Sequence, residues 1–168
     1  RDTARMLYAI YAVMTLALTL LLVLSGLPLF DAGIHALGTA GTGGFSSRNQ
    51  SVGAYNNLAA EILITVFMFL FGTNFIVYFR LLRGEGPRAL RHEEVGVYYL
   101  IGFGAIALIT LNTTGRYGDV WTALRYASFQ VASIMSTTGY ATCNFDLWPQ
   151  FSRVLLLVLM FIGACAGS

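Results

Sequence analysis

The sequence has 168 residues, of which 57% are hydrophobic and 11% are charged, and its net charge is +2. This composition, with a mean hydropathy of +0.69, excludes a soluble globular protein and is typical of a membrane protein. The apolar composition predicts membrane lipid around the chain. The small net charge gives no indication of nucleic-acid binding, so we expect no nucleic acid.

The first predicted unit covers residues 1–80 and contains two apolar runs that can cross a membrane. The run over 7–27 carries no charge, and the run over 58–79 carries a single glutamate. At about 1.5 Å per residue, each can cross a hydrocarbon core of about 30 Å. Between them we expect a short helix over 29–40 and then a glycine-containing segment over 42–46, called glycine segment 1. A helix of about 18 Å cannot cross the membrane and must stop partway.

A basic loop over 81–94 separates this unit from the second. All ten basic residues of the chain are arginines, and six of them lie before the first span or close to this loop. Loops on the cytoplasmic side of membrane proteins carry an excess of basic residues, so we expect the N-terminus and this loop in the cytoplasm. The six are Arg1, Arg5, Arg80, Arg83, Arg88 and Arg91.

The second predicted unit covers residues 95–168 and has the same order of elements. A span over 95–111 is followed by a short helix over 121–135, by glycine segment 2 over 137–141, and by an apolar run over 151–168. The uncharged stretch over 154–168 would reach only about 22 Å, which is too short to cross a bilayer. We therefore expect the sequence to be a fragment that stops inside a spanning helix.

The two units align when the chain is shifted by 95 residues. The predicted fold is accordingly an all-α membrane protein built from repeated units of helix, pore loop and helix. The shift brings Thr42, Gly44, Phe45, Ser47 and Asn49 onto Thr137, Gly139, Tyr140, Thr142 and Asn144.

The glycine segments pose an energetic problem at membrane depth. An unpaired backbone carbonyl in hydrocarbon costs several kcal/mol, so irregular backbone survives there only inside protein or beside a water-filled cavity. A cation can satisfy several such oxygens at once, and the negative end of the preceding helix favours it further. Glycine permits the backbone angles that turn successive carbonyls toward one axis. The pattern predicts a site for a dehydrated monovalent cation.

These residues resemble a known family. The segment TTGY at 137–140 resembles a reduced form of the TVGYG filter of potassium channels. The longer stretch FQVASIMSTTGYATCNFDLWPQFSRVLLLVLMFIGACAGS closely resembles the third repeat of the bacterial TrkH/TrkG/KtrB potassium-uptake family, and LGTAGTGGFSSRN resembles its second. The resemblance covers essentially all 168 residues.

This resemblance implies potassium uptake across the bacterial inner membrane, through one pore surrounded by four helix–pore loop–helix repeats. Gly44 and Gly139 would be the filter glycines of two repeats. Potassium is the transported ion, bound mainly through backbone oxygens, and no organic cofactor is implied. The residues that would bind it are Thr42, Gly43, Gly44, Thr137, Thr138 and Gly139.

The resemblance also implies a gate and protein partners. Family members have a glycine-rich intramembrane loop in the helix that here begins at Phe151. They assemble as homodimers and bind cytoplasmic nucleotide-binding regulatory subunits of the TrkA/KtrA kind. The residues that would lead into the gate are Gly163, Ala164, Gly167 and Ser168.

Two other functions are compatible with parts of the pattern. A secondary transporter with broken helices also places irregular backbone at mid-membrane, although its interruptions fall within spans, whereas these fall between them. An intramembrane hydrolase could use Ser46 or Ser168 as nucleophile and His35 as base. We expect no enzymatic activity, because the sequence indicates no nucleophile–base pairing.

Four polar residues have competing interpretations. For Asn74 we favour an interhelical hydrogen bond over a cavity ligand. Glu61, about one turn into its span, is expected to snorkel or pair outward rather than draw cations to the pore. Arg48 is expected to face solvent or an acidic partner, because it would repel a cation on the axis. For His35 we favour a hydrogen-bonded structural role over a pH sensor.

The repeat makes a geometric prediction. If the units are two sectors of one pore, Gly44 and Gly139 should lie side by side, in a parallel repeat about an axis along the membrane normal. Phe45 and Tyr140 should then turn away from the axis into protein. We expect serine at either glycine to weaken potassium uptake or its preference over sodium to a similar extent.

Overall fold

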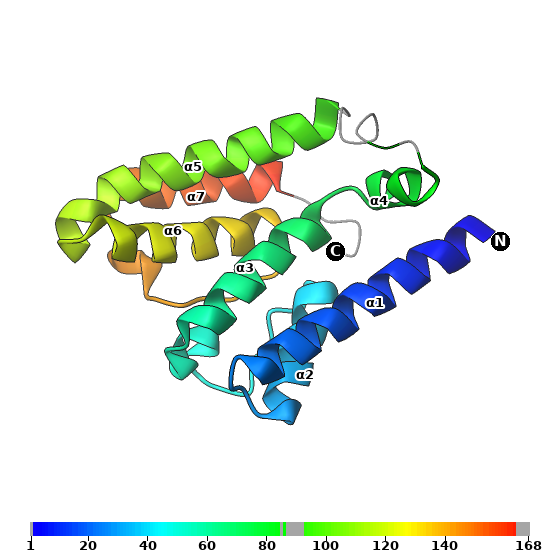
Figure 1. The fold of residues 1–168 in the computed structure, drawn as a ribbon. Coiled ribbons are helices and arrows are strands. Elements are labelled where there is room, and N and C mark those ends of the chain that lie inside the picture. The colour runs from blue at the N-terminus through cyan, green and yellow to red at the C-terminus, as the bar shows by residue number, and fades with distance from the viewer. Residues whose placement is uncertain (1, 85, 87–92, 164–168) are drawn as a thin grey trace.

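The computed structural model describes residues 2–84, 86 and 93–163, and its regular structure there is entirely helical. Figure 1 shows the helices in two groups, which correspond to the two predicted units. In unit 1 the elements are α1 (Asp2–Leu24), α2 (Leu29–Ala40), the 3₁₀ helix η1 (Ser51–Tyr55), α3 (Leu58–Gly72) and α4 (Phe75–Leu82). In unit 2 they are α5 (Glu93–Tyr117), α6 (Val120–Met135), the 3₁₀ helix η3 (Phe145–Leu147) and α7 (Gln150–Ile162).

In unit 1, α1 and α2 form a helical hairpin. α1 is long and apolar enough to cross a membrane, and it ends before a turn in which Gly26 adopts φ +104. α2 begins after Pro28, whose fixed φ of −56 suits a helix start, and has the bounds expected for the first short helix. Three alanines four residues apart are buried and allow α2 to pack closely on α1: Ala32, Ala36 and Ala40.

The expected span over 58–79 is not one continuous helix, because the chain bends there by 85°. α3 ends at Gly72, and Thr73 is extended with φ −75 and ψ 143. Asn74 then caps α4, since its side-chain oxygen accepts a hydrogen bond from the Ile76 N–H at 3.0 Å. Its amide also donates to Glu94 Oε2 at 3.3 Å, which agrees with the predicted interhelical role. The polar Thr-Asn pair therefore stops one helix and starts the next.

The bend bears on the orientation of the chain. α4 packs on α1, and Figure 1 shows α4 at the same end of the molecule as the N-terminus. Arg80 of α4 and Arg5 near the start of α1 therefore share one side, which we expect to be cytoplasmic. A cysteine placed at Gly86 in a cysteine-free background should react with a membrane-impermeant maleimide only after the cells are opened. Labelling in intact cells would reverse this topology.

Unit 2 contains a longer span than the expected 95–111. α5 continues to Tyr117. The threonine hydroxyls near its end bond to carbonyls of the preceding turn: Thr113 donates to the Ile109 carbonyl at 2.7 Å and Thr114 to the Thr110 carbonyl at 2.6 Å. α7 ends at Ile162, and residues 164–168 of the expected run over 151–168 lie outside the described residues.

Asp119 starts α6 by accepting a hydrogen bond from the Thr122 N–H at 3.0 Å. The Thr122 backbone N–H and hydroxyl stabilise the Asp119 carboxylate and lower its pKa. The expected second short helix, 121–135, therefore begins one residue earlier, at Val120. The cap and the first turn of α6 are thus fixed directly after the end of α5.

The two units pack in the same way internally and meet along α3 and α6. α1, α2 and α3 contact one another in unit 1, as α5, α6 and α7 do in unit 2, and α3 packs on α6 between the units. The last seven residues of α6, 129–135, are all buried. α1 and α5 run in the same general direction and α3 and α7 return, as in a parallel repeat (Figure 1). This arrangement brings the two glycine segments to the junction between the units.

Candidate ion-binding site

The two glycine segments share an unusual backbone conformation. In segment 1, φ is 52 at Thr42 and 68 at Gly44, and in segment 2 it is 60 at Thr137 and 89 at Gly139. Positive φ is rare for a β-branched residue such as threonine and needs support from surrounding structure. The same left-handed pair therefore recurs 95 residues apart, at the positions that the sequence repeat aligns.

The hydrogen bonds that hold these turns also correspond. The Gly43 N–H donates to the Gly38 carbonyl at 2.8 Å, and the Thr138 N–H donates to the Ser133 carbonyl at 2.9 Å. Each segment thus directs backbone N–H groups back onto the end of its own short helix. Among the hydrogen bonds of the described residues, none is accepted by the carbonyls of the six residues predicted to bind the ion. These oxygens remain available to a ligand.

Backbone contacts bring the two segments together. A Cβ added to Gly44 would collide with the Thr138 carbonyl oxygen and would lie 3.4 Å from the Gly139 carbonyl carbon. Gly139 itself faces open space, with no atom within 4 Å of an added Cβ. The expectation that Gly44 and Gly139 lie side by side is therefore confirmed. Their environments differ, however, so serine at the two positions should not have similar effects.

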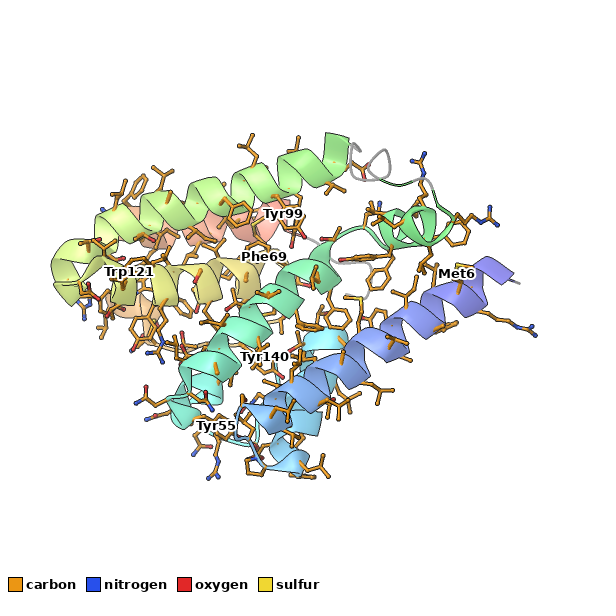
Figure 2. The ribbon with its side chains drawn as sticks, viewed as in Figure 1. Met6, Tyr55, Phe69, Tyr99, Trp121 and Tyr140 are labelled. Carbon is orange, nitrogen blue, oxygen red and sulfur yellow. The ribbon has the colours of Figure 1, made fainter. Side chains whose placement is uncertain are left out.

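Tyr140 connects segment 2 to unit 1. Its side chain is fully buried, and its hydroxyl donates toward the Phe45 carbonyl at 3.2 Å and the His35 carbonyl at 3.3 Å. Figure 2 shows Tyr140 at the junction of the units. Gly38 of α2 leaves room for the ring, because a Cβ there would collide with the Tyr140 hydroxyl. The expectation that Tyr140 turns into protein is confirmed, and it does so across the boundary between units.

Phe45 does not follow Tyr140. Its side chain is 82% exposed, so the expectation that it turns into protein is wrong for the described part of the chain. Tyr140 packs beside α2 of the other unit, near the His35 ring at 5.4 Å between centroids. No described residue occupies the corresponding place beside Phe45. The aromatic residue of a glycine segment is therefore buried by a neighbouring unit and not by its own.

Hydrogen bonds from α2 hold the chain that leaves segment 1. The Asp31 carbonyl accepts a hydrogen bond from His35 Nδ1 at 2.7 Å, which leaves Nε2 to accept from the Ser46 hydroxyl at 2.9 Å. His35 is therefore structural, as favoured from the sequence. The Ser46 hydroxyl also accepts from the Arg48 N–H at 3.2 Å. The imidazole is fully buried, and a backbone carbonyl orients it in place of the carboxylate of a Ser-His-Asp triad.

Asp31 of α2 and Arg48 both take part in the contacts of the turn that follows glycine segment 1. Asp31 Oδ1 accepts a hydrogen bond from the Ser47 hydroxyl at 2.7 Å, which in turn contacts the Tyr55 hydroxyl at 2.9 Å. The exposed Arg48 guanidinium lies over the Tyr55 ring, 5.8 Å from its centroid. Arg48 therefore faces solvent and an aromatic ring, as expected from the sequence, because on the axis it would repel a cation.

A second set of contacts joins the units beyond the glycine segments. The Gly53 N–H donates to the Ala141 carbonyl at 3.2 Å, and the Ala141 N–H donates to the Ser51 hydroxyl at 3.3 Å. Gly53 permits this approach, since an added Cβ would lie 2.5 Å from the Thr142 carbonyl oxygen. Sequence reasoning missed Ser51 and Gly53, for which the small residues of η1 are the only signal.

The expectation for Glu61 is wrong, because it pairs inward. Its side chain is 3% exposed and forms an ion pair with Arg125 of α6. The signal was present in the sequence, as Glu61 and Arg125 are the lone charged residues of their apolar helices. Sequence reasoning missed the pair because nothing local relates two residues in different units.

The end of α7 touches the end of α6. A Cβ added to Gly163 would lie 2.7 Å from both Cα and the carbonyl oxygen of Met135. Gly163 ends α7 in an extended conformation, with φ −69 and ψ 136, as Thr73 does after α3. The other residues predicted to lead into a gate lie outside the described residues: Ala164, Gly167 and Ser168. The gate stays a prediction.

Known proteins resemble this chain along its whole length. The profile of the TrkH family, described as "Cation transport protein", matches residues 1–168. The chain is 35% identical to the Trk system potassium uptake protein TrkH of Salmonella typhimurium and 31% identical to TrkG of Escherichia coli, with 99% of the chain and 35% of each relative covered.

The solved structures give the same result. The crystal structure of the potassium transporter TrkH from Vibrio parahaemolyticus matches with a TM-score of 0.91 at 32% identity, covering 99% of this chain and 37% of that one. The chain thus spans about a third of the length of the relatives it matches. Together with its apolar helices, this makes the chain part of an integral membrane protein. The chain belongs to the TrkH family of cation transport proteins.

Proposed function

We propose that this chain supplies two adjoining sectors of a pore for potassium uptake across the bacterial inner membrane. The observation that carries the proposal is the contact of the two glycine segments, which share one backbone conformation and meet where Gly44 abuts Thr138. The matched relatives are named as potassium uptake proteins. The ion would be held mainly by backbone oxygens of Thr42, Gly43, Gly44, Thr137, Thr138 and Gly139.

The electrostatics of the short helices support a cation at this place. α2 ends at Ala40 and α6 at Met135, directly before the two segments. The C-terminal end of a helix carries about half a negative charge, so both helices favour a cation beside the segments. The six carbonyls, free of protein donors among the described residues, supply the oxygens that replace a hydration shell. Because the proposed ligands are backbone oxygens, binding of the ion requires no change in the charge of a side chain.

The secondary-transporter alternative has less support. In that class, inverted repeats place broken helices on opposite sides of a midplane site. Here the helices of the two units run in the same sense, and the irregular segments follow the short helices instead of interrupting the spans (Figure 1). The bend between α3 and α4 does interrupt a span, but it lies outside both glycine segments, although Gly72 before it approaches the Ser136 side chain.

The partners follow from the family resemblance and are part of the proposal. We propose a homodimer in the membrane and cytoplasmic nucleotide-binding regulatory subunits, with no nucleic acid and no organic cofactor bound by this chain. The basic stretch around α4, with Arg80 and Arg83, lies on the proposed cytoplasmic side together with the start of α1.

Cation flux through the full-length protein in liposomes tests the proposed function. We expect uptake of potassium and rubidium, which are similar in size, and slower uptake of sodium, because the carbonyl oxygens would replace the hydration shell of the larger ions. Empty liposomes and liposomes with a Gly139→Ser variant are the controls. Equal flux of all three ions, or flux that Gly139→Ser leaves unchanged, would contradict the filter assignment.

A further inference from the structure

A buried ion pair joins the two units away from the glycine segments. Arg125 donates from Nε to Glu61 Oε2 at 2.6 Å and from Nη2 to Glu61 Oε1 at 2.7 Å, so the pair is bidentate. The Glu61 side chain is 3% exposed and that of Arg125 is 25% exposed. Burial strongly disfavours an unpaired carboxylate, and removing either partner of such a pair leaves an uncompensated charge. The pair therefore constrains how α3 and α6 pack.

Each partner is fixed within its own unit. Glu61 lies in the first turn of α3, which Asn57 caps by accepting a hydrogen bond from the Ala60 N–H at 3.2 Å. The Asn57 amide also donates to the Ser25 carbonyl at 2.8 Å, which fastens this turn to the end of α1. Arg125 lies on α6, whose C-terminus leads directly into glycine segment 2. The pair thus links the frame of unit 1 to the short helix of unit 2.

The repeated unit does not itself require this pair. The shift of 95 residues places Phe30 at the position of Arg125 in unit 1, where its ring is 75% exposed. Glu61 is the fourth residue of α3, and the fourth residue of α7 is Arg153. Because each unit has a different residue at the corresponding position, the pair serves the contact between the units and not the fold of one unit.

We infer that Glu61 and Arg125 form a clamp that sets the position of α6, and with it glycine segment 2, against glycine segment 1. The inference rests on the proposed function of these segments. Segment 1 touches segment 2 through backbone atoms at Gly44 and Thr138, so a small shift of α6 changes the spacing of the oxygens. Ion selection depends on the number and spacing of such oxygens. Both residues are positioning residues, which act on the ion through α6.

The test measures the ratio of potassium to sodium uptake by the full-length protein in liposomes. Glu61→Gln and Arg125→Gln should each lower this ratio about tenfold, within the range of couplings between residues in direct contact. The reversed pair, Glu61→Arg with Arg125→Glu, should return the ratio to within about threefold of the unaltered protein.

Two further variants separate positioning from folding. The neutral pair Glu61→Gln with Arg125→Met leaves no buried charge and should fold, yet it should show the lowered ratio because the clamp is missing. This pair decides the question if the reversed pair fails to fold. Arg116→Gln, which removes an exposed arginine from the end of α5, is the matched control and should keep the ratio. Thermal unfolding of the purified proteins confirms that each variant compared is folded.

Several outcomes would overturn the clamp. They are an unchanged ratio in both single variants, an unchanged ratio in the neutral pair, and a folded reversed pair that regains nothing. The clamp would also be overturned if a variant gives less folded protein but the folded protein keeps a normal ratio of potassium to sodium uptake. That is the effect expected of an ion pair that only stabilises the fold. If the unaltered protein itself shows no preference for potassium, the proposed function fails first. If Gly139→Ser lowers the ratio and the Glu61 and Arg125 variants do not, the clamp alone fails.

Discussion

Gly44→Ala should reduce potassium uptake by at least tenfold, whereas Gly139→Ala should reduce it only a few-fold. A methyl group on Gly44 collides with the Thr138 carbonyl oxygen, which is backbone and can move only if the two glycine segments separate. A methyl group on Gly139 meets no atom within 4 Å. Its cost is the strain of a side chain at φ +89, about 1–3 kcal/mol. The two glycines therefore differ although the sequence repeat aligns them.

Initial rates of uptake in cells that lack other potassium transporters measure this difference, with the amount of protein in the membrane determined for each variant. Gly33→Ala is the matched control, because Gly33 lies in α2 and an added Cβ has no neighbour within 4 Å. This variant should transport normally. An effect of Gly139→Ala equal to or greater than that of Gly44→Ala would show that backbone strain, and not the contact between segments, dominates.

Local features of the chain were predictable because their causes are local. Pro28 and Gly41 bound the first short helix, and α2 has the expected residues. The left-handed turns at Gly44 and Gly139 occur where a glycine stands two residues after a threonine, at matching positions in the repeat. A shift of 95 residues relates the two segments in sequence, and three backbone hydrogen bonds of one segment recur in the other.

Contacts between the units were less predictable, because no local pattern relates residues that far apart. Glu61 and Arg125 are 64 residues apart, and each alone is equally compatible with an outward-facing charge. The exposure of Phe45 is a similar case, since its counterpart Tyr140 is buried by another unit. The bend after α3 had a local signal in Thr73 and Asn74, but the apolar residues continue through it and the hydropathy conceals it.

The Tyr140 hydroxyl and the missing side chain of Gly38 make a second strong prediction. Gly38→Ala should greatly reduce potassium uptake, because the new methyl group collides with the hydroxyl and forces the Tyr140 ring out of its buried place beside α2. Segment 2 would move with it. Tyr140→Phe keeps the ring but leaves the Phe45 and His35 carbonyls without this donor, at a cost of about 1–3 kcal/mol. Its effect should therefore be smaller.

Combining the two substitutions distinguishes the collision from the loss of hydrogen bonds. Once the hydroxyl is absent, the next atom near a Cβ on Gly38 is Cζ of the ring at 3.2 Å, which a shift of a few tenths of an ångström can relieve. Gly38→Ala with Tyr140→Phe should thus transport better than Gly38→Ala alone and about as well as Tyr140→Phe, a non-additive result expected of residues in direct contact. Uptake rates and thermal unfolding of the four proteins measure the coupling. Additive losses would mean that Gly38 and Tyr140 act independently, and that the tyrosine does not hold segment 2 against unit 1.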